Sequence, residues 1–178
     1  MMQTHLHGFL HYSQIPQPED PTIFCPLIWD LREAPASSAR LAARPESPLT
    51  TRELNSPATQ PSVTSLAITC DLLLASWTIE ARNSLFVTIS DVLRAVYVAL
   101  HVPIKTSEWD TLSRKQQDRI HEAFQRRCRL AIDPAQCEAA GVMRIDYLGH
   151  HTLFGGLSPS LETDNTCILS LRRLPRSP

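Results

Sequence analysis

The chain has 178 residues, which is within the usual size of one domain, and 43% of them are apolar, enough for one hydrophobic core. The formal net charge is −1 and the isoelectric point is about 6.6, which argues against the broad basic surface that drives nonspecific nucleic-acid binding. Fourteen prolines stand against five glycines, and because most of the prolines lie near the two ends, the ends are predicted to be irregular.

The first third of the chain is predicted to contain little regular structure. Residues 1–24 are polar and contain prolines, and we interpret them as an irregular N-terminal arm. Residues 25–33 are predicted to form a first short strand. Residues 34–64 carry five prolines, which remove amide donors and fix φ. This proline-rich segment is therefore predicted to be an extended surface crossing that packs on the core through Leu49.

Strands and a helix are predicted for the middle of the chain. Apolar side chains alternate over residues 66–72 and 77–81, which is the period of half-buried antiparallel strands. Residues 85–90 are expected to add a short strand. A helix is then expected to start at Ser90 or Asp91, because either residue suits an N-cap.

Two further helices are predicted from their capping residues. Ser113 is expected to cap a long helix whose inner stripe includes Ile120 and Cys128. Asp133 suits the N-cap of a short helix, and Gly141 suits the position just after its end. Both helices should therefore have sharp boundaries.

The last part of the chain is predicted to return to strands, over residues 142–148, 152–157 and 166–174. Strands, then helices, then strands favour the α+β class, with an antiparallel sheet of about five to seven strands and two to three helices on one face. Residues 25–174 would then form a single domain, and residues 175–178 a tail.

Five motifs follow one another along the chain: WDLR, PATQPSVTSL, VTISDVL, RRC and GVMRIDYLGHHTLFGGL. In this order they resemble an uncharacterised fungal domain family that is abundant in basidiomycete mushrooms. The resemblance covers roughly residues 25–173 and implies a compact α+β domain. It implies no catalytic residues, because none are established for the family.

Cysteine spacing and targeting signals bear on the compartment and on cofactors. The five cysteines are scattered, odd in number and never form a C-x-x-C pair, unlike those of a secreted disulfide framework or a structural zinc site. The first residues do not resemble a signal peptide, and no stretch approaches 18 apolar residues. We therefore expect a cytoplasmic protein with no membrane attachment, no metal ion and no other cofactor.

The segment RIDYLGHHTLFGG contains the strongest candidates for chemistry. His150 and His151 are adjacent, and Asp146 lies shortly before them. Histidine is the commonest general acid or base, and an aspartate often orients it. Since the segment also has the glycines of a tight turn, we favour a polar hairpin tip, with a catalytic role as the alternative.

Cys128 is a further candidate, as a nucleophile. The neighbouring Arg126, Arg127 and Arg129 favour a thiolate, whereas the negative end of the helix dipole opposes it. The spacing also places Cys128 on the inner face of its helix, where cysteine usually fills the core. The sequence separation of Cys128 and Cys137 does not establish that the two thiols are close.

Charged residues give two further expectations. Asp30 with Arg32, and Arg144 with Asp146, are spaced i, i+2 and are interpreted as structural ion pairs on strand faces. If the tail arginines fold near the arginines of the long helix, a local positive patch forms on an otherwise neutral chain. These tail residues are Arg172, Arg173 and Arg176.

The function predicted from these observations is a non-enzymatic domain that binds a protein or a small ligand. The chain has no G-x-S-x-G, P-loop, G-x-G-x-x-G, H-E-x-x-H or EF-hand motif, and the proline-rich segment suits lying across a surface. The alternative is a small enzyme that uses Asp146, His150, His151 or Cys128. Phosphate binding through the arginines is a third hypothesis, and nucleic-acid binding is the least favoured.

The final predicted strand bears on self-association. A strand at the end of a chain often lies at a sheet edge, where unpaired amides invite another chain. Arg172 and Arg173 discourage such pairing, and Pro175 limits the length of the ladder. We expect the strand to pair within its own domain, and the protein to be a monomer or a weak dimer.

Overall fold

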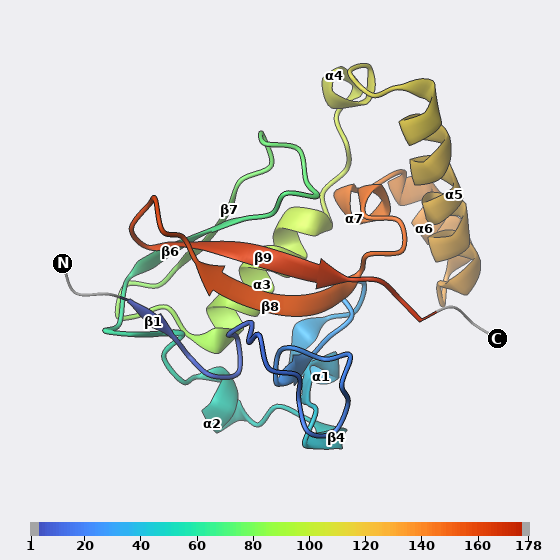
Figure 1. The fold of residues 1–178 in the computed structure, drawn as a ribbon. Helices are drawn as coiled ribbons and strands as arrows, with labels where there is room; N and C mark the ends of the chain where they lie inside the picture. The colour runs from blue at the N-terminus through green and yellow to red at the C-terminus, as the bar shows by residue number, and fades with distance from the viewer. Residues whose placement is uncertain (1–3, 176–178) are drawn as a thin grey trace.

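The computed structural model describes residues 4–175, and over that range it has a mixed α+β fold (Figure 1). No helix in this range is long and apolar enough to cross a membrane. The helices are α1 (Pro35–Ser38), α2 (Thr51–Leu54), α3 (Ile89–Leu100), α4 (Thr106–Trp109), α5 (Arg114–Leu130), α6 (Pro134–Ala140) and α7 (Arg144–Tyr147). The strands are β1 (His5–Leu6), β2 (Leu27–Ile28), β3 (Arg40–Leu41), β4 (Arg44–Pro48), β5 (Thr59–Gln60), β6 (Ser65–Thr69), β7 (Ile79–Arg82), β8 (Leu153–Pro159) and β9 (Thr166–Arg172).

The predicted α+β class is confirmed, but the predicted single sheet with two to three helices is wrong. Within residues 4–175 there are seven helices, and the strands form three sheets, of two, three and four strands. The two smaller sheets pair β1 with β5, and β2 with β3 and β4. Their strands are mostly only two residues long, so they lack the extended alternating pattern from which a strand is predicted.

The four-stranded sheet has the order β7-β6-β9-β8, and its β6–β9 pair is parallel. The predicted antiparallel sheet is therefore wrong at this pair. β9 lies inside the sheet, with β8 antiparallel on its other side, and not at the edge expected for a last strand. Parallel neighbours require a long crossover, and here the chain between β6 and β9 contains β7, β8 and helices α3 to α7. β9 thus pairs within its own domain on both sides.

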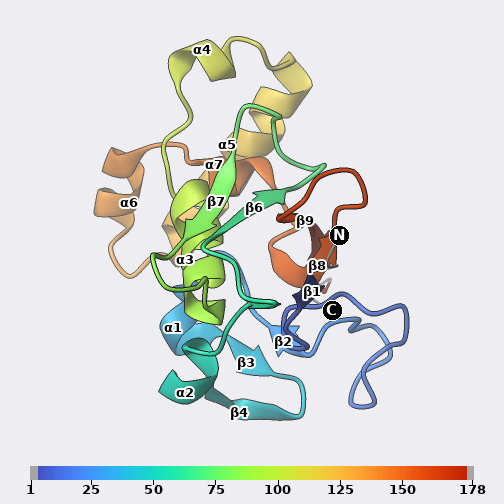
Figure 2. The ribbon, with the colours of Figure 1, turned by 90° about the vertical axis from the view of Figure 1, so that its left-hand side faces the viewer.

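Helix α3 covers one face of this sheet (Figure 2). Leu66 of β6 and Leu169 of β9 are buried in the shared core, whereas Ile168 of β9 is exposed. The N-cap of α3 is Thr88, which is two residues earlier than the nearer of the two predicted caps. Asp91 occupies the third helical position instead, where its carboxylate accepts hydrogen bonds from the backbone and the side chain of Thr88.

The proline-rich segment is more regular than predicted. It contains α1, α2, β3, β4 and β5, and β3 and β4 join β2 in the three-stranded sheet. Leu49 packs on the core, as predicted. Proline is tolerated in edge strands and at strand ends, and a small sheet consists mostly of such positions. The proline content therefore did not exclude strands in this segment, and the prediction of an irregular crossing was wrong.

Much of the N-terminal segment is irregular, yet it packs against the sheet. Leu10 is completely buried, and the amide of Tyr12 donates a hydrogen bond to the carbonyl of Leu157 in β8. The backbone of Tyr12 passes directly over Gly156, where a side chain would collide with it.

The predicted strand at residues 142–148 is wrong, since residues 144–147 form α7. The carboxylate of Asp146 accepts a hydrogen bond from the amide of Met143 at 2.9 Å. This contact caps the first turn of a helix and therefore favours α7 over a strand. Ile145 is buried under the turn. A run this short alternates equally well as a strand or as one turn of helix. The expected caps of α5 and α6, Ser113 and Asp133, are confirmed.

Candidate functional site

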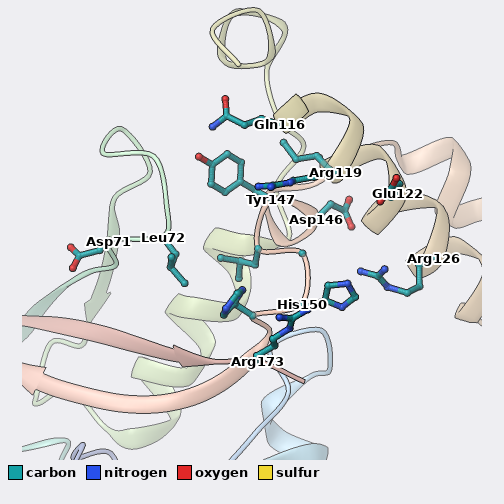
Figure 3. A pocket seen from close by; sticks show the side chains of 14 residues that line it. Asp71, Leu72, Gln116, Arg119, Glu122, Arg126, Asp146, Tyr147, His150 and Arg173 are labelled. Atoms are coloured by element: carbon teal, nitrogen blue, oxygen red, sulfur yellow. The ribbon is translucent and has the colours of Figure 1, made fainter. Parts of the chain in front are cut away.

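A cleft of about 720 Å³ lies where α5, α7 and the end of β9 meet (Figure 3). Gln116 and Tyr147 line its upper end in this view, and His150, Arg126 and Arg173 lie at its lower end. The loop after β6 provides the opposite wall through Asp71 and Leu72. The cleft thus collects side chains from segments that are far apart in the sequence.

Charged side chains of both signs line this cleft, and its carboxylates are those of Asp71, Glu122 and Asp146. Arg119 and Arg126 of α5 and Arg173 after β9 line it. None of these three takes part in an ion pair within residues 4–175. The tail arginine Arg173 therefore does lie near an arginine of the long helix, as the sequence suggested for a folded tail. Arg176 is outside the described residues.

A backbone hydrogen bond holds His150 among these charges. The amide of Leu174 donates a hydrogen bond to the carbonyl of His150 at 2.8 Å, which ties the end of β9 to the loop before β8. Burial, followed by the charges of Arg126 and Arg173, lowers the pKa of His150. A lowered histidine pKa is the expected response to a positive electrostatic potential.

The hairpin interpreted for His150 and His151 is wrong. Both residues lie in the loop that joins α7 to β8, after Gly149, which adopts a positive φ of 60°. The amide of His151 donates a hydrogen bond to the carbonyl of Leu148 at 3.0 Å, which closes the turn. Both histidines are exposed, and both line the cleft.

Asp146 also lines the cleft, but its carboxylate is held by another residue. Arg127 donates two hydrogen bonds to it, from Nε and Nη2, each at 2.8 Å. Asp146 is only 3% exposed, so the pair is a buried bidentate ion pair. The same guanidinium donates to the carbonyl of Gly141 and to the sulfur of Cys137. No hydrogen bond within the described range joins Asp146 to His150 or His151.

The predicted ion pairs are half right. Asp30 and Arg32 are paired, with 2.6 Å between Oδ2 and Nη2. Arg144 does not pair with Asp146, because α7 directs the two residues to different partners. Arg144 lies 3.5 Å from the carboxylate of Glu108 and stacks over the ring of Trp77.

Cys128 lies apart from the cleft. Its side chain is buried, and burial raises the pKa of the thiol to about 11, so the thiol is protonated at neutral pH. It donates a hydrogen bond to the sulfur of Cys137 in α6. The four predicted candidates therefore separate: Asp146, His150 and His151 line one cleft, and Cys128 is buried behind it with a different partner.

A small void of about 10 Å³ adjoins the cleft, since Arg126, Asp146 and Gly149 line both. Arg32 and Thr152 also line the void. Thr152 is 1% exposed, and its hydroxyl has no hydrogen-bond partner in the described chain. Burying a hydroxyl without a hydrogen-bond partner lowers the stability of the fold. A polar ligand atom placed beside Thr152 would gain a hydrogen bond from this hydroxyl.

Sequence reasoning did not identify Arg119, Arg32 or Thr152 as site residues. Arg119 and Arg126 are seven residues apart, which places them on one face of a helix, and this spacing was a usable signal. Thr152 and Arg32 had no such signal, because they reach the cleft only through the packing of the folded chain. Within residues 4–175, no group of three or more His, Cys, Asp or Glu side chains could hold a metal ion.

Comparison with known proteins gives a family but no function. Neither the curated proteins nor the solved structures contain a match to the chain. Residues 27–166 match the model of a family described as a family of unknown function (DUF6699). This match covers more than half of the chain and most of the α+β domain, including α5, α7 and the two histidines. The chain belongs to this family of unknown function.

Proposed function

We propose that this domain binds, and does not convert, a small ligand that carries a phosphate or a similar oxyanion group, in the cleft between α5, the α7–β8 loop and the end of β9. One observation carries the proposal. Arg119 and Arg126 of α5 line one cleft together with Arg173 after β9, and the three take part in no ion pair within the described residues.

The chemistry of these side chains suits an oxyanion. A guanidinium presents a planar fork of donors that matches phosphate and carboxylate groups, often through two hydrogen bonds. The cleft volume of about 720 Å³ is in the range of small-molecule sites. His150 and His151 add ring nitrogens to the same wall, and each nitrogen becomes a donor when the ring is protonated.

The deep side of the cleft supports the same ligand class. Arg32 is paired with Asp30, but its charge still contributes to lowering the pKa of His150. The hydroxyl of Thr152 is free to donate a hydrogen bond toward the void beside Arg126. An oxyanion in the cleft would thus lie near positive charge on two sides.

A small ligand is favoured over a protein partner and over catalysis. The proline-rich segment, which suggested a protein-binding surface, packs on the chain's own core. The enzymatic alternative requires Asp146 to orient a histidine, whereas the hydrogen bonds of Asp146 go to Arg127 and to the backbone of Met143. The function therefore needs no proton transfer by Asp146.

Titration with inorganic phosphate tests the proposal. In amide-resolved NMR spectra of the full chain, we expect saturable shifts at Gly149, His150 and Thr152. The double variant Arg126→Ala with Arg173→Ala should weaken binding by about tenfold or more, because charge-assisted hydrogen bonds contribute about 1.5–3 kcal/mol each. Arg94→Ala removes an exposed arginine of α3 outside the cleft and serves as the matched control.

Two results would contradict the proposal. One is the absence of saturable shifts, and the other is an equal loss of binding in the Arg94 control. Release of phosphate from p-nitrophenyl phosphate that disappears in His150→Ala would instead favour the enzymatic alternative.

The fungal origin, the cytoplasmic location and the weak or absent self-association expected from the sequence are part of this proposal. Sedimentation at micromolar protein concentration tests the last of these, since a stable dimer would contradict it.

A further inference from the structure

Two buried thiols meet where α5 joins α6. Cys128 in the last turn of α5 and Cys137 in α6 are 2% and 9% exposed. Their sulfur atoms are 2.8 Å apart, and the thiol of Cys128 donates toward the sulfur of Cys137. The other cysteines have no such neighbour: the thiol of Cys25, for example, donates to the carbonyl of Phe9.

The sulfur of Cys137 differs from that of Cys128 in one contact. Nη1 of Arg127 donates a hydrogen bond to it at 3.0 Å. A nearby guanidinium stabilises a negatively charged sulfur, which is the nucleophile in thiol chemistry. Cys137 is also the more exposed of the two residues. Both features make Cys137 the sulfur that reacts first.

We propose that Cys128 and Cys137 form a reversible modification site, which closes to a disulfide when the protein meets a small disulfide oxidant such as oxidised glutathione. The thiolate of Cys137 attacks one sulfur of the oxidant, breaks its S–S bond and releases one glutathione thiolate. The sulfur of Cys128, after losing its proton to solvent, then attacks Cys137, and the mixed disulfide breaks to release the second thiolate. The protein loses two electrons and two protons, and the oxidant becomes two thiols.

The product would join two helices across a short connection. The two cysteines are nine residues apart, and the disulfide would fix the end of α5 to α6. A cross-link of this kind stabilises a fold mainly by restricting the unfolded chain. Arg127 would keep its hydrogen bonds to Asp146 and Gly141. The modification is therefore expected to stabilise the corner beside the cleft without dismantling it.

The test uses the full chain in buffers with increasing ratios of oxidised to reduced glutathione. We expect a mass loss of about 2 Da per chain, reversed by dithiothreitol, and a rise in the thermal midpoint of about 5 °C. Cys137→Ser should abolish both changes. Cys70→Ser should leave both intact, and it is the matched control because Cys70 is half-buried and distant from the pair in sequence.

A direct measurement on the unmodified sequence covers the case in which Cys137→Ser does not fold. Trypsin leaves Cys128 in the dipeptide 128–129 and Cys137 in the peptide 130–144. Non-reducing digestion of the natively oxidised protein should therefore yield these two peptides joined. Finding them separate, with glutathione or a disulfide only at other cysteines, would overturn the proposal. This test is independent of the proposed ligand, because no readout involves the cleft.

Discussion

The four-stranded sheet and the corner formed by α5, α6 and α7 are built by different kinds of contact. Apolar side chains hold the sheet and α3 together, for example Leu66, Leu157 and Leu169. A single guanidinium organises the corner, since Arg127 donates to Asp146, to the carbonyl of Gly141 and to the sulfur of Cys137. Burial of apolar surface tolerates many arrangements, whereas a buried charge requires specific partners. The sheet is thus the support, and the corner determines the shape of the cleft.

The largest effect that separates the two regions is expected from removing Arg127. In Arg127→Met, the carboxylate of Asp146 stays buried without its partner, so the free energy of unfolding should fall by about 3–5 kcal/mol. The matched control is Arg32→Met, which breaks the more exposed pair with Asp30 and should cost about 0–1 kcal/mol. Urea denaturation measures both. Equal losses in the two variants would mean that the corner does not depend on its buried ion pair.

The same contrast explains what the sequence could predict. The strands predicted at residues 66–72 and 77–81 correspond to β6 and β7, and, like the helix caps Ser113 and Asp133 and the last two strands, they follow from periodicity and local capping. These signals lie within a few residues of the element they predict. The short strand expected at residues 85–90 is wrong, because α3 already begins at Ile89. The ion pair of Arg127 with Asp146 joins residues 19 positions apart, and no local pattern specifies it. The assignment of residues 142–148 to a strand failed for this reason, because Asp146 in α7 is held by Arg127, which lies far from it in the sequence.

Part of the candidate site was also predictable. The sequence singled out His150, His151 and Asp146 as candidates for chemistry, and all three line the cleft. It did not reveal that the carboxylate of Asp146 is ion-paired with Arg127. Nor did it place Thr152 beside Arg126, because β8 and α5 meet only in the folded chain. Which arginines lack a carboxylate partner is a property of the tertiary structure alone.

A second contrast concerns two glycines, one in each region. Gly156 in β8 has a φ of 113°, and a Cβ there would lie 2.9 Å from the amide nitrogen of Tyr12. Gly149 in the cleft loop has a φ of 60°, with no atom within 4 Å of such a Cβ. Gly156→Ala should therefore lower the free energy of unfolding by about 2–3 kcal/mol, through strain and collision. Gly149→Ala should lower it by about 1 kcal/mol, through backbone strain alone.

Thermal unfolding of the two glycine variants checks this prediction. If Gly149→Ala is the more destabilising, the cleft loop is packed more tightly than the sheet, contrary to the comparison of the two regions. Hydrogen exchange at the N-terminal segment provides an internal check. The amide of Tyr12, which donates to the carbonyl of Leu157, should lose its protection from exchange in Gly156→Ala but keep it in Gly149→Ala.

The smallest expected effect is a dependence on pH at the mouth of the cleft. Folding lowers the pKa of His150, chiefly through burial and then through Arg126 and Arg173. As the pH falls, the unfolded chain takes up this proton before the folded chain does, so His150 makes the fold slightly less stable below its unfolded pKa. A bound anion offsets the arginine charges and should raise the pKa of His150 toward its ordinary value. By linkage, protonation of His150 must then tighten anion binding.

Sulfate is the suitable probe for this dependence, because its charge is constant between about pH 8 and about pH 5, whereas phosphate itself titrates in that range. We expect sulfate to bind about fivefold more tightly at the lower pH, and the imidazole signal of His150 in NMR spectra to titrate at higher pH when sulfate is present. His150→Gln should flatten the pH dependence of the sulfate affinity. His121→Gln, at an exposed histidine of α5 outside this cleft, should leave it unchanged. An unaltered pH dependence in His150→Gln would show that the charge at this position is not coupled to the anion, and the corner would then contribute shape to the cleft but no titratable group.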